Sequence, residues 1–500
     1  MKPTEEQHQG TFQDTERSPN LTINHIPDEL LLEIFDFYRR GINSYDDLWK
    51  KKKVWVNLSH VCRRWRAVMF ASSSRLELGI TVGSKKPGHI KAILSGPLPI
   101  LIDYKCRNEN LTGSALWRLR AALGHSDRVR EISFEGSDAW FGQFFTATTN
   151  CSFPVLESLS LCFGRGLRHG DDPKLPDTFL RGPDLSDLHP SLRRLSLKYV
   201  SLTSISGLLS SAKALTDLFL VIELGSNPSA QTSLLDCFQG IPCLRRLDLS
   251  TSIFIKALPK PSTPKDIVPF SKLTFFRYVG NIIFLDALVA RLSAPPLLDV
   301  DIAFSGATST ISPIVHLPRF INDIEERYHA VHLVLQGRVF SLSLLTHSEY
   351  INHCKPRFKL CRSPGDLGYH IDMIDSLMRV SDALSTKLST VEELRVTSFT
   401  DIWVGNIPWR RFLRQFSCVK ALRIGGVKNS EIARLILRNY TEPDDHLPFL
   451  PALEEIELPK FEARETRSQF SKRTAELALF QPFVSARQQA GRPVKVFFGQ

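Results

Sequence analysis

Apolar residues recur at helical spacing in two stretches near the N-terminus, which predicts two amphipathic helices between residues 24 and 71. The first helix is expected to begin at Pro27, where a missing N–H does no harm, and Asp28 and Glu29 suit the positive end of its dipole. Its apolar stripe consists of Leu30, Leu31, Ile34, Phe35 and Tyr38. The second helix is expected to carry one continuous stripe, made of Leu58, Val61, Cys62, Trp65 and Met69.

From residue 76 onward the pattern changes to short strand-like segments. Segments at 76–82, 98–104 and 129–134 come first, and a series with apolar residues at its first, fourth and sixth positions follows. The fourth-position residues are Leu159, Leu195, Leu218, Leu247, Phe276, Val300, Leu394, Leu422 and Ile456. The long gap between Val300 and Leu394 contains another strand-like stretch at 331–345.

Helix-like segments lie between these strands, at 202–213, 229–240, 282–294, 371–388 and 429–439. Strand followed by helix at a spacing of about 20–40 residues predicts a solenoid, because each unit buries its apolar face only against its neighbours. We expect the strands to form one parallel sheet. Three stretches rich in Pro, Gly or Asp predict loops inserted between repeats, at 164–191, 256–269 and 440–451.

The strand pattern resembles leucine-rich repeats, whose unit runs L-x-x-L-x-L-x-x-N/C-x-L. The match holds over the first six positions of each repeat. At the Asn/Cys position, whose side chain bonds the backbone of the turn in that family, only Asn281 conforms. The resemblance therefore concerns architecture more than sequence.

The N-terminal segments carry a more specific motif. Residues 26–35 read IPDELLLEIF, and residues 58–69, after a basic loop, read LSHVCRRWRAVM. This resembles the F-box, whose pattern is roughly Leu-Pro-x-Glu-Leu-Leu-x-x-Ile-Phe and then Leu-x-x-Val-Cys-Arg-x-Trp-Arg. The whole chain resembles the large F-box families of mushroom-forming fungi, in which an irregular leucine-rich-repeat region follows the F-box.

The resemblance implies an α/β fold, with a small N-terminal helical F-box followed by an irregular leucine-rich-repeat solenoid with a parallel sheet and outer helices. The expected domains are a disordered tail at 1–20, the F-box at 21–75 and the solenoid, with loop insertions, at 76–500. The implied function is that of a substrate-recognition subunit of a Skp–cullin–F-box ubiquitin ligase. In such a ligase the F-box binds a Skp-type adaptor and through it a cullin, and the repeats bind a target protein.

The resemblance also implies which residues contact the adaptor. They are Ile26, Pro27, Glu29, Leu30, Leu31, Ile34, Phe35, Leu58, Val61, Cys62 and Trp65. Two short amphipathic helices have too little chain to cover all of these apolar groups. We therefore expect the stripe of the first helix, including Leu31 and Phe35, to be partly exposed in the isolated chain.

Composition and charge narrow the classes of function. The net charge of +11 is concentrated in residues 39–91, which hold thirteen basic and three acidic residues. A local basic segment of this kind suits an acidic partner of any chemistry. The nine cysteines form no CxxC pair, which favours a reducing compartment, cytoplasm or nucleus. No apolar run is long enough to predict a membrane span.

Other functions remain as alternatives. A ligase-independent interaction scaffold fits the same pattern. Nucleic-acid binding is less favoured, because glutamate pairs at Glu392–Glu393 and Glu454–Glu455 would interrupt a phosphate track, and Arg63, Arg64 and Arg66 are expected on a solvated helix face. The histidines and cysteines match no metal-ligand spacing, and no catalytic motif is visible, so we expect no enzyme, metal or cofactor.

Overall fold

The computed structural model describes the chain in segments. These are residues 25–40, 58–72, 80–83, 98–105, 113–148, 151–163, 191–200, 209, 212–223, 234, 237–252, 267–294, 297–305, 315–324, 327–336, 339–346, 358–362, 371–399, 408–426, 450–458, 478 and 480–498. The chain divides into two compact units. The first holds Met1–Val82 and Pro87–Leu101, and the second holds Gly83–Lys86 and Ile102–Gln500.

The first unit contains helices α1 (Asp28–Arg40) and α3 (Arg63–Ala71), which pack against each other. Residues 58 and 59 are also helical, but residues 60–62 are not. The second helix predicted over 58–69 is therefore wrong as a single element, since the chain turns before Cys62 and a new helix begins there. Strands β1 (Ile80–Gly83) and β2 (Ile100–Lys105) lie where the division between the units passes through the chain.

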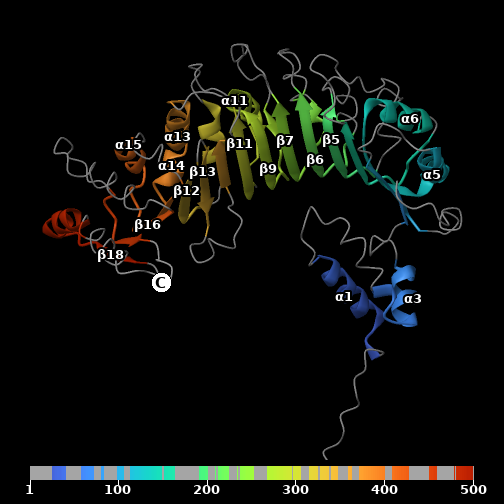
Figure 1. The fold of residues 1–500 in the computed structure, drawn as a ribbon, viewed down its shortest axis with the longest axis horizontal. Helices are drawn as coiled ribbons and strands as arrows, with labels where there is room; N and C mark the ends of the chain where they lie inside the picture. Colours follow the sequence, from blue (N-terminus) through green and yellow to red (C-terminus); the bar gives the residue numbers. More distant parts are fainter. Residues whose placement is uncertain are drawn as a thin grey trace, which may run out of the picture. The chain divides into compact units, whose positions relative to one another are not determined.

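The second unit is built around one large sheet, drawn as the row of arrows in Figure 1. Its strands from β3 onward are β3 (Val129–Gly136), β4 (Ser158–Phe163), β5 (Arg194–Val200), β6 (Asp217–Glu223), β7 (Arg246–Ser252), β9 (Phe275–Asn281), β11 (Asp299–Ser305), β12 (Ala330–Gln336), β13 (Val339–Leu345), β14 (Phe358–Arg362), β15 (Glu393–Ser398), β16 (Ala421–Gly426), β17 (Glu455–Leu458) and β18 (Lys495–Phe498). Their spatial order is β3-β4-β5-β6-β7-β9-β11-β14-β13-β12-β15-β16-β17-β18. A small parallel pair, β8 (Val268–Pro269) with β10 (Leu292–Ser293), lies apart from it.

The register of the sheet follows the repeat pattern of the sequence. Fourth-position leucines pair directly, as Leu159 with Leu195 and Leu195 with Leu218, and the ladder continues through Leu247 and Phe276 to Val300. These side chains are buried and alternate with half-exposed neighbours along each strand. A one-residue slip would expose the whole apolar set, so burial of one face fixes the register.

The sheet departs from the prediction in one region, between β11 and β15. There β12 and β13 form an antiparallel hairpin, and β14 pairs antiparallel with β13 and parallel with β11. The expectation of an entirely parallel sheet is therefore wrong at β13. These three strands, β12, β13 and β14, occupy the long gap in the repeat series. Parallel pairing resumes where β12 pairs with β15.

Helices connect many of the strands. They are α5 (Gly113–Leu123), α6 (Asp138–Thr148), α11 (Ile282–Val289), α12 (His316–Asn322), α13 (Ile371–Ala383), α14 (Ser385–Leu388) and α15 (Trp409–Leu413), with a 3₁₀ turn at Ser126–Arg128. Residues 480–489 are also helical. Several of these helices, including α11, α13 and α15, follow one side of the row of strands (Figure 1). This arrangement confirms the α/β class, with N-terminal helices followed by a sheet that is parallel except at β13.

Two side chains hold helix starts in place. Asn281 accepts a hydrogen bond from the backbone N–H of Ile283 at 2.8 Å and caps α11, so the one repeat position that conforms to the family pattern does bond the turn. Asp286, buried in α11, accepts from the N–H groups of His316 and Leu317 at 2.8 and 2.7 Å. It thereby satisfies orphan donors at the start of α12.

Some predicted features lie wholly or mostly outside the described residues. They are the tail at 1–20, the helices at 202–213 and 429–439, and the loops at 164–191, 256–269 and 440–451.

Candidate functional site

One face of α1 forms the core of the first unit. Leu31 and Phe35 are fully buried and pack with Val68 and Met69 of α3. The rings of Phe35 and Trp65 meet edge to face, with centroids 4.8 Å apart. The expectation that Leu31 and Phe35 are partly exposed in the isolated chain is therefore wrong, because α3 covers them. The partly buried members of the same cluster are Ile26, Leu58 and Trp65.

The adjacent face of α1 is apolar and exposed. The exposed fractions are 55% for Leu30, 45% for Ile34, 81% for Phe37 and 50% for Tyr38. At 3.6 residues per turn these four side chains occupy about a third of the helix circumference, next to the buried face. We call these four residues the exposed arc. Phe37 was not singled out from the sequence, although its spacing from Leu30 and Ile34 is helical.

The turn before α3 is held by Cys62. Its extended backbone places Sγ to accept a hydrogen bond from the backbone N–H of Trp65 at 3.4 Å, so Cys62 is the N-cap of α3. This orientation leaves Val61 on the surface, 56% exposed, and places Trp65 against Phe35. Cys62 thus acts within the unit, whereas Val61 is available to a partner.

Arginines of α3 connect it to the rest of the unit. Arg64 donates to the carboxylate of Asp28 at 2.6 Å and to the carbonyl of Ile26 at 2.5 Å, which links α3 to the start of α1. Arg66 donates to the carbonyl of Ser59 at 2.9 Å. Two of the three arginines considered for a nucleic-acid face are therefore already engaged within the protein.

A model of the F-box-like family matches residues 23–73. Residues 23–73 are an F-box-like domain. Solved structures that match the chain include the leucine-rich repeat-containing protein LegL7 from Legionella pneumophila, at 11% sequence identity and a TM-score of 0.25, over 65% of this chain and 82% of that one. No curated protein matches the sequence.

The residues expected at the adaptor thus divide into three groups within the F-box. Leu31 and Phe35 are core, and Ile26, Leu58, Cys62 and Trp65 are only partly exposed. The group open to a partner consists of Pro27, Glu29, Leu30, Ile34 and Val61. The structure adds Phe37, Tyr38 and Phe70 to the exposed apolar side chains.

The described residues contain no group of three or more His, Cys, Asp or Glu side chains able to hold a metal ion. Within the same segments, no helix is both long and apolar enough to cross a membrane.

Proposed function

We propose that this protein is a substrate-recognition subunit of a Skp–cullin–F-box ubiquitin ligase. The observation that carries the proposal is the exposed arc of α1, inside the segment that matches the F-box-like family. The described residues of the F-box form a buried cluster, and α1 presents four large apolar side chains to solvent beside it. A Skp-type adaptor covers these side chains, and the adaptor brings the cullin.

The size of the exposed arc suits a protein partner. Four such side chains expose on the order of several hundred Å², about as much as the largest apolar patch on a typical monomer. At about 25 cal/mol per Å², covering them gains several kcal/mol before the cost of association is subtracted. The basic residues in the 39–91 region increase the rate of capture of an acidic adaptor.

The repeat unit supplies the surface for the target. Repeat scaffolds present a long sheet face on which one side chain from each strand is available to a partner. The receptor in this proposal contributes binding and no catalytic group, and it acts in the cytoplasm, the nucleus or both.

Affinity purification of the tagged chain from cells, followed by mass spectrometry, tests the proposal. We expect a Skp-type adaptor and a cullin to be enriched together, and both to be lost when Ile34 is replaced by aspartate. Adaptor without cullin would instead support the ligase-independent scaffold. Recovery of neither partner would refute the assignment.

A further inference from the structure

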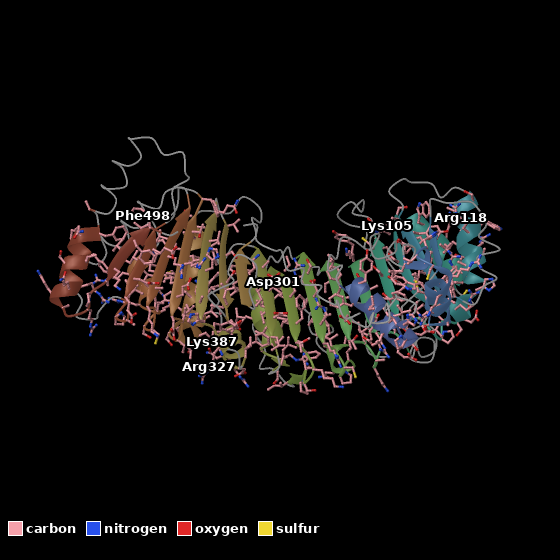
Figure 2. All side chains as sticks on the ribbon, turned by 90° about the horizontal axis from the view of Figure 1, so that it is seen from below. Lys105, Arg118, Asp301, Arg327, Lys387 and Phe498 are labelled. Carbon is pink, nitrogen blue, oxygen red and sulfur yellow. The ribbon has the colours of Figure 1, made fainter. Side chains whose placement is uncertain are left out.

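The large sheet ends at β18 on an apolar layer that is only half covered. β18 is the last strand in the spatial order and pairs with β17 on one side; its Phe498 lies near one end of the row of strands in Figure 2. Its core-facing Val496 is in register with Ile456 of β17. Ile456 is 1% exposed, whereas Val496 is half-buried. Repeat arrays usually cover such an end with a polar cap, so this layer is open to a partner.

The opposite face of β18 carries an exposed aromatic ring beside a cation. Phe497 is 38% exposed. It continues a line that holds charged side chains on the three strands before it, namely Arg395, Arg423 and Glu457. Lys495, two residues before Phe497 and on the same face, is also exposed. β18 therefore offers a partner a ring and an ammonium group on one face and apolar surface on the other.

The backbone of β18 also directs polar groups away from β17. The N–H of Lys495 donates to the carbonyl of Glu454 at 2.9 Å, so Lys495 and Phe497 turn their backbone groups toward β17. Backbone groups alternate in direction along a strand, so the N–H and C=O of Val496 point the other way. No strand of the described segments pairs with that side of β18. Such an edge is a template for pairing with another strand.

We propose that β18 pairs with β18 of a second copy of this chain, antiparallel and about a two-fold axis at Val496. In this register the N–H and C=O groups of the two Val496 residues bond each other, and the two side chains cover each other on the core side. On the opposite face, Lys495 of each copy lies beside Phe497 of the other. This inference goes beyond the proposed function and does not depend on the adaptor.

The same sheet shows that a cation and a ring on neighbouring strands attract each other. Arg246 of β7 is in register with Phe275 of β9, and its guanidinium lies over that ring, 4.1 Å from the centroid. The ammonium group of Lys198 lies over the ring of Phe219 at 5.1 Å. Directly opposite residues of an antiparallel pair are at least as close, so Lys495 can reach Phe497 of the second copy. β18 thus complements itself, which favours a second copy as the occupant of this edge.

The pairing is short, so the dimer is expected to be weak and reversible. β18 has four residues, and two such strands bury much less than the roughly 1,200–2,000 Å² of a stable interface. We therefore expect the chain to be monomeric at about 1 µM and to associate as its concentration approaches about 100 µM.

Analytical ultracentrifugation of the full chain over this concentration range tests the pairing. Val496→Pro removes the outward N–H and no bond to β17, at a place where an edge strand tolerates proline. Val496→Ala is the matched control, because it loses the same side chain and keeps the N–H. We expect Val496→Pro to weaken association at least tenfold more than Val496→Ala does. Any association through the exposed arc of α1 is common to both variants and cancels in the comparison.

Oxidative cross-linking tests the register. In the proposed pair the Cα atoms of the two Val496 residues lie about 5.5 Å apart, within the range of a disulfide. The two Phe497 residues are displaced by two positions and lie about 8 Å apart, beyond that range. Val496→Cys should therefore form at least fivefold more disulfide-linked dimer than Phe497→Cys or the unchanged chain with its nine cysteines. Random collision would instead favour position 497, which is more exposed.

Three results would overturn the inference. A chain that is still monomeric at about 100 µM would leave the edge to a strand of another protein. Equal association of Val496→Pro and Val496→Ala would show that the outward N–H forms no bond between copies. Equal cross-linking at positions 496 and 497 would contradict the two-fold axis. Thermal melting checks the fold of each variant, and if Val496→Pro melts early, the cross-linking comparison still decides.

Discussion

Replacing Ile34 by aspartate tests whether the exposed arc is the adaptor contact. Ile34 is 45% exposed and lies outside the buried cluster of Leu31 and Phe35, so the change leaves the F-box core intact. Burying a whole isoleucine side chain stabilises by roughly 1.5–3 kcal/mol, so covering the exposed half contributes about 1 kcal/mol to binding. Ile34→Ala should therefore weaken adaptor binding about fivefold.

Aspartate should have a much larger effect than alanine. It would place an unpaired carboxylate inside the contact, at a cost of several kcal/mol in addition to the lost apolar burial. We expect at least about a hundredfold weaker binding for Ile34→Asp. Titration calorimetry or surface plasmon resonance with purified adaptor measures both variants, and circular dichroism checks that their helical content and melting temperature are unchanged.

Leu31→Ala is the matched control on the neighbouring face of the same helix. Leu31 is fully buried in the F-box, so its truncation should cost about 2–5 kcal/mol of folding stability and weaken binding only through unfolding. Binding by Ile34→Asp at wild-type strength would refute the assignment of the exposed arc. A lowered melting temperature in Ile34→Asp, equal to that of Leu31→Ala, would place Ile34 in the core instead.

Three further predictions concern the repeat unit, and urea denaturation measures all of them. Asp286→Ala should lower the free energy of unfolding by about 2–3 kcal/mol, because backbone donors at the start of α12 lose their acceptor; a loss below about 0.5 kcal/mol would contradict this. Gly280→Ala should cost about 1–3 kcal/mol, since an added Cβ would lie 2.1 Å from Thr251 Oγ1, and Thr251→Ala in the same chain should recover part of the loss. Burial raises the pKa of the Tyr278 hydroxyl well above its ordinary value. The stability that the neutral hydroxyl contributes is therefore complete below the unfolded-state pKa of about 10, and it falls as the pH rises beyond that value. Tyr278→Phe should flatten this fall in the free energy of unfolding between pH 9 and about 11.

The sequence was most informative where one face of a strand is buried. Fourth-position residues such as Leu195 and Leu218 were expected on neighbouring strands and are directly paired. Period-two burial allows only one register, so the pattern determines the pairing as well as the strands. The pattern does not determine whether neighbouring strands run parallel or antiparallel, because buried and exposed residues alternate in the same way in both. The stretch at 331–345 was expected as one strand-like segment of a parallel sheet, but it forms two strands, β12 and β13, that pair antiparallel.

The F-box shows a second limit of sequence patterns. Leu30 and Ile34 are as apolar as Leu31 and Phe35 and lie next to them around the helix, so periodicity alone cannot tell which pair faces the core. The answer depends on where α3 packs. The position of α3 in turn depends on the N-cap at Cys62, a residue type that rarely signals a helix start.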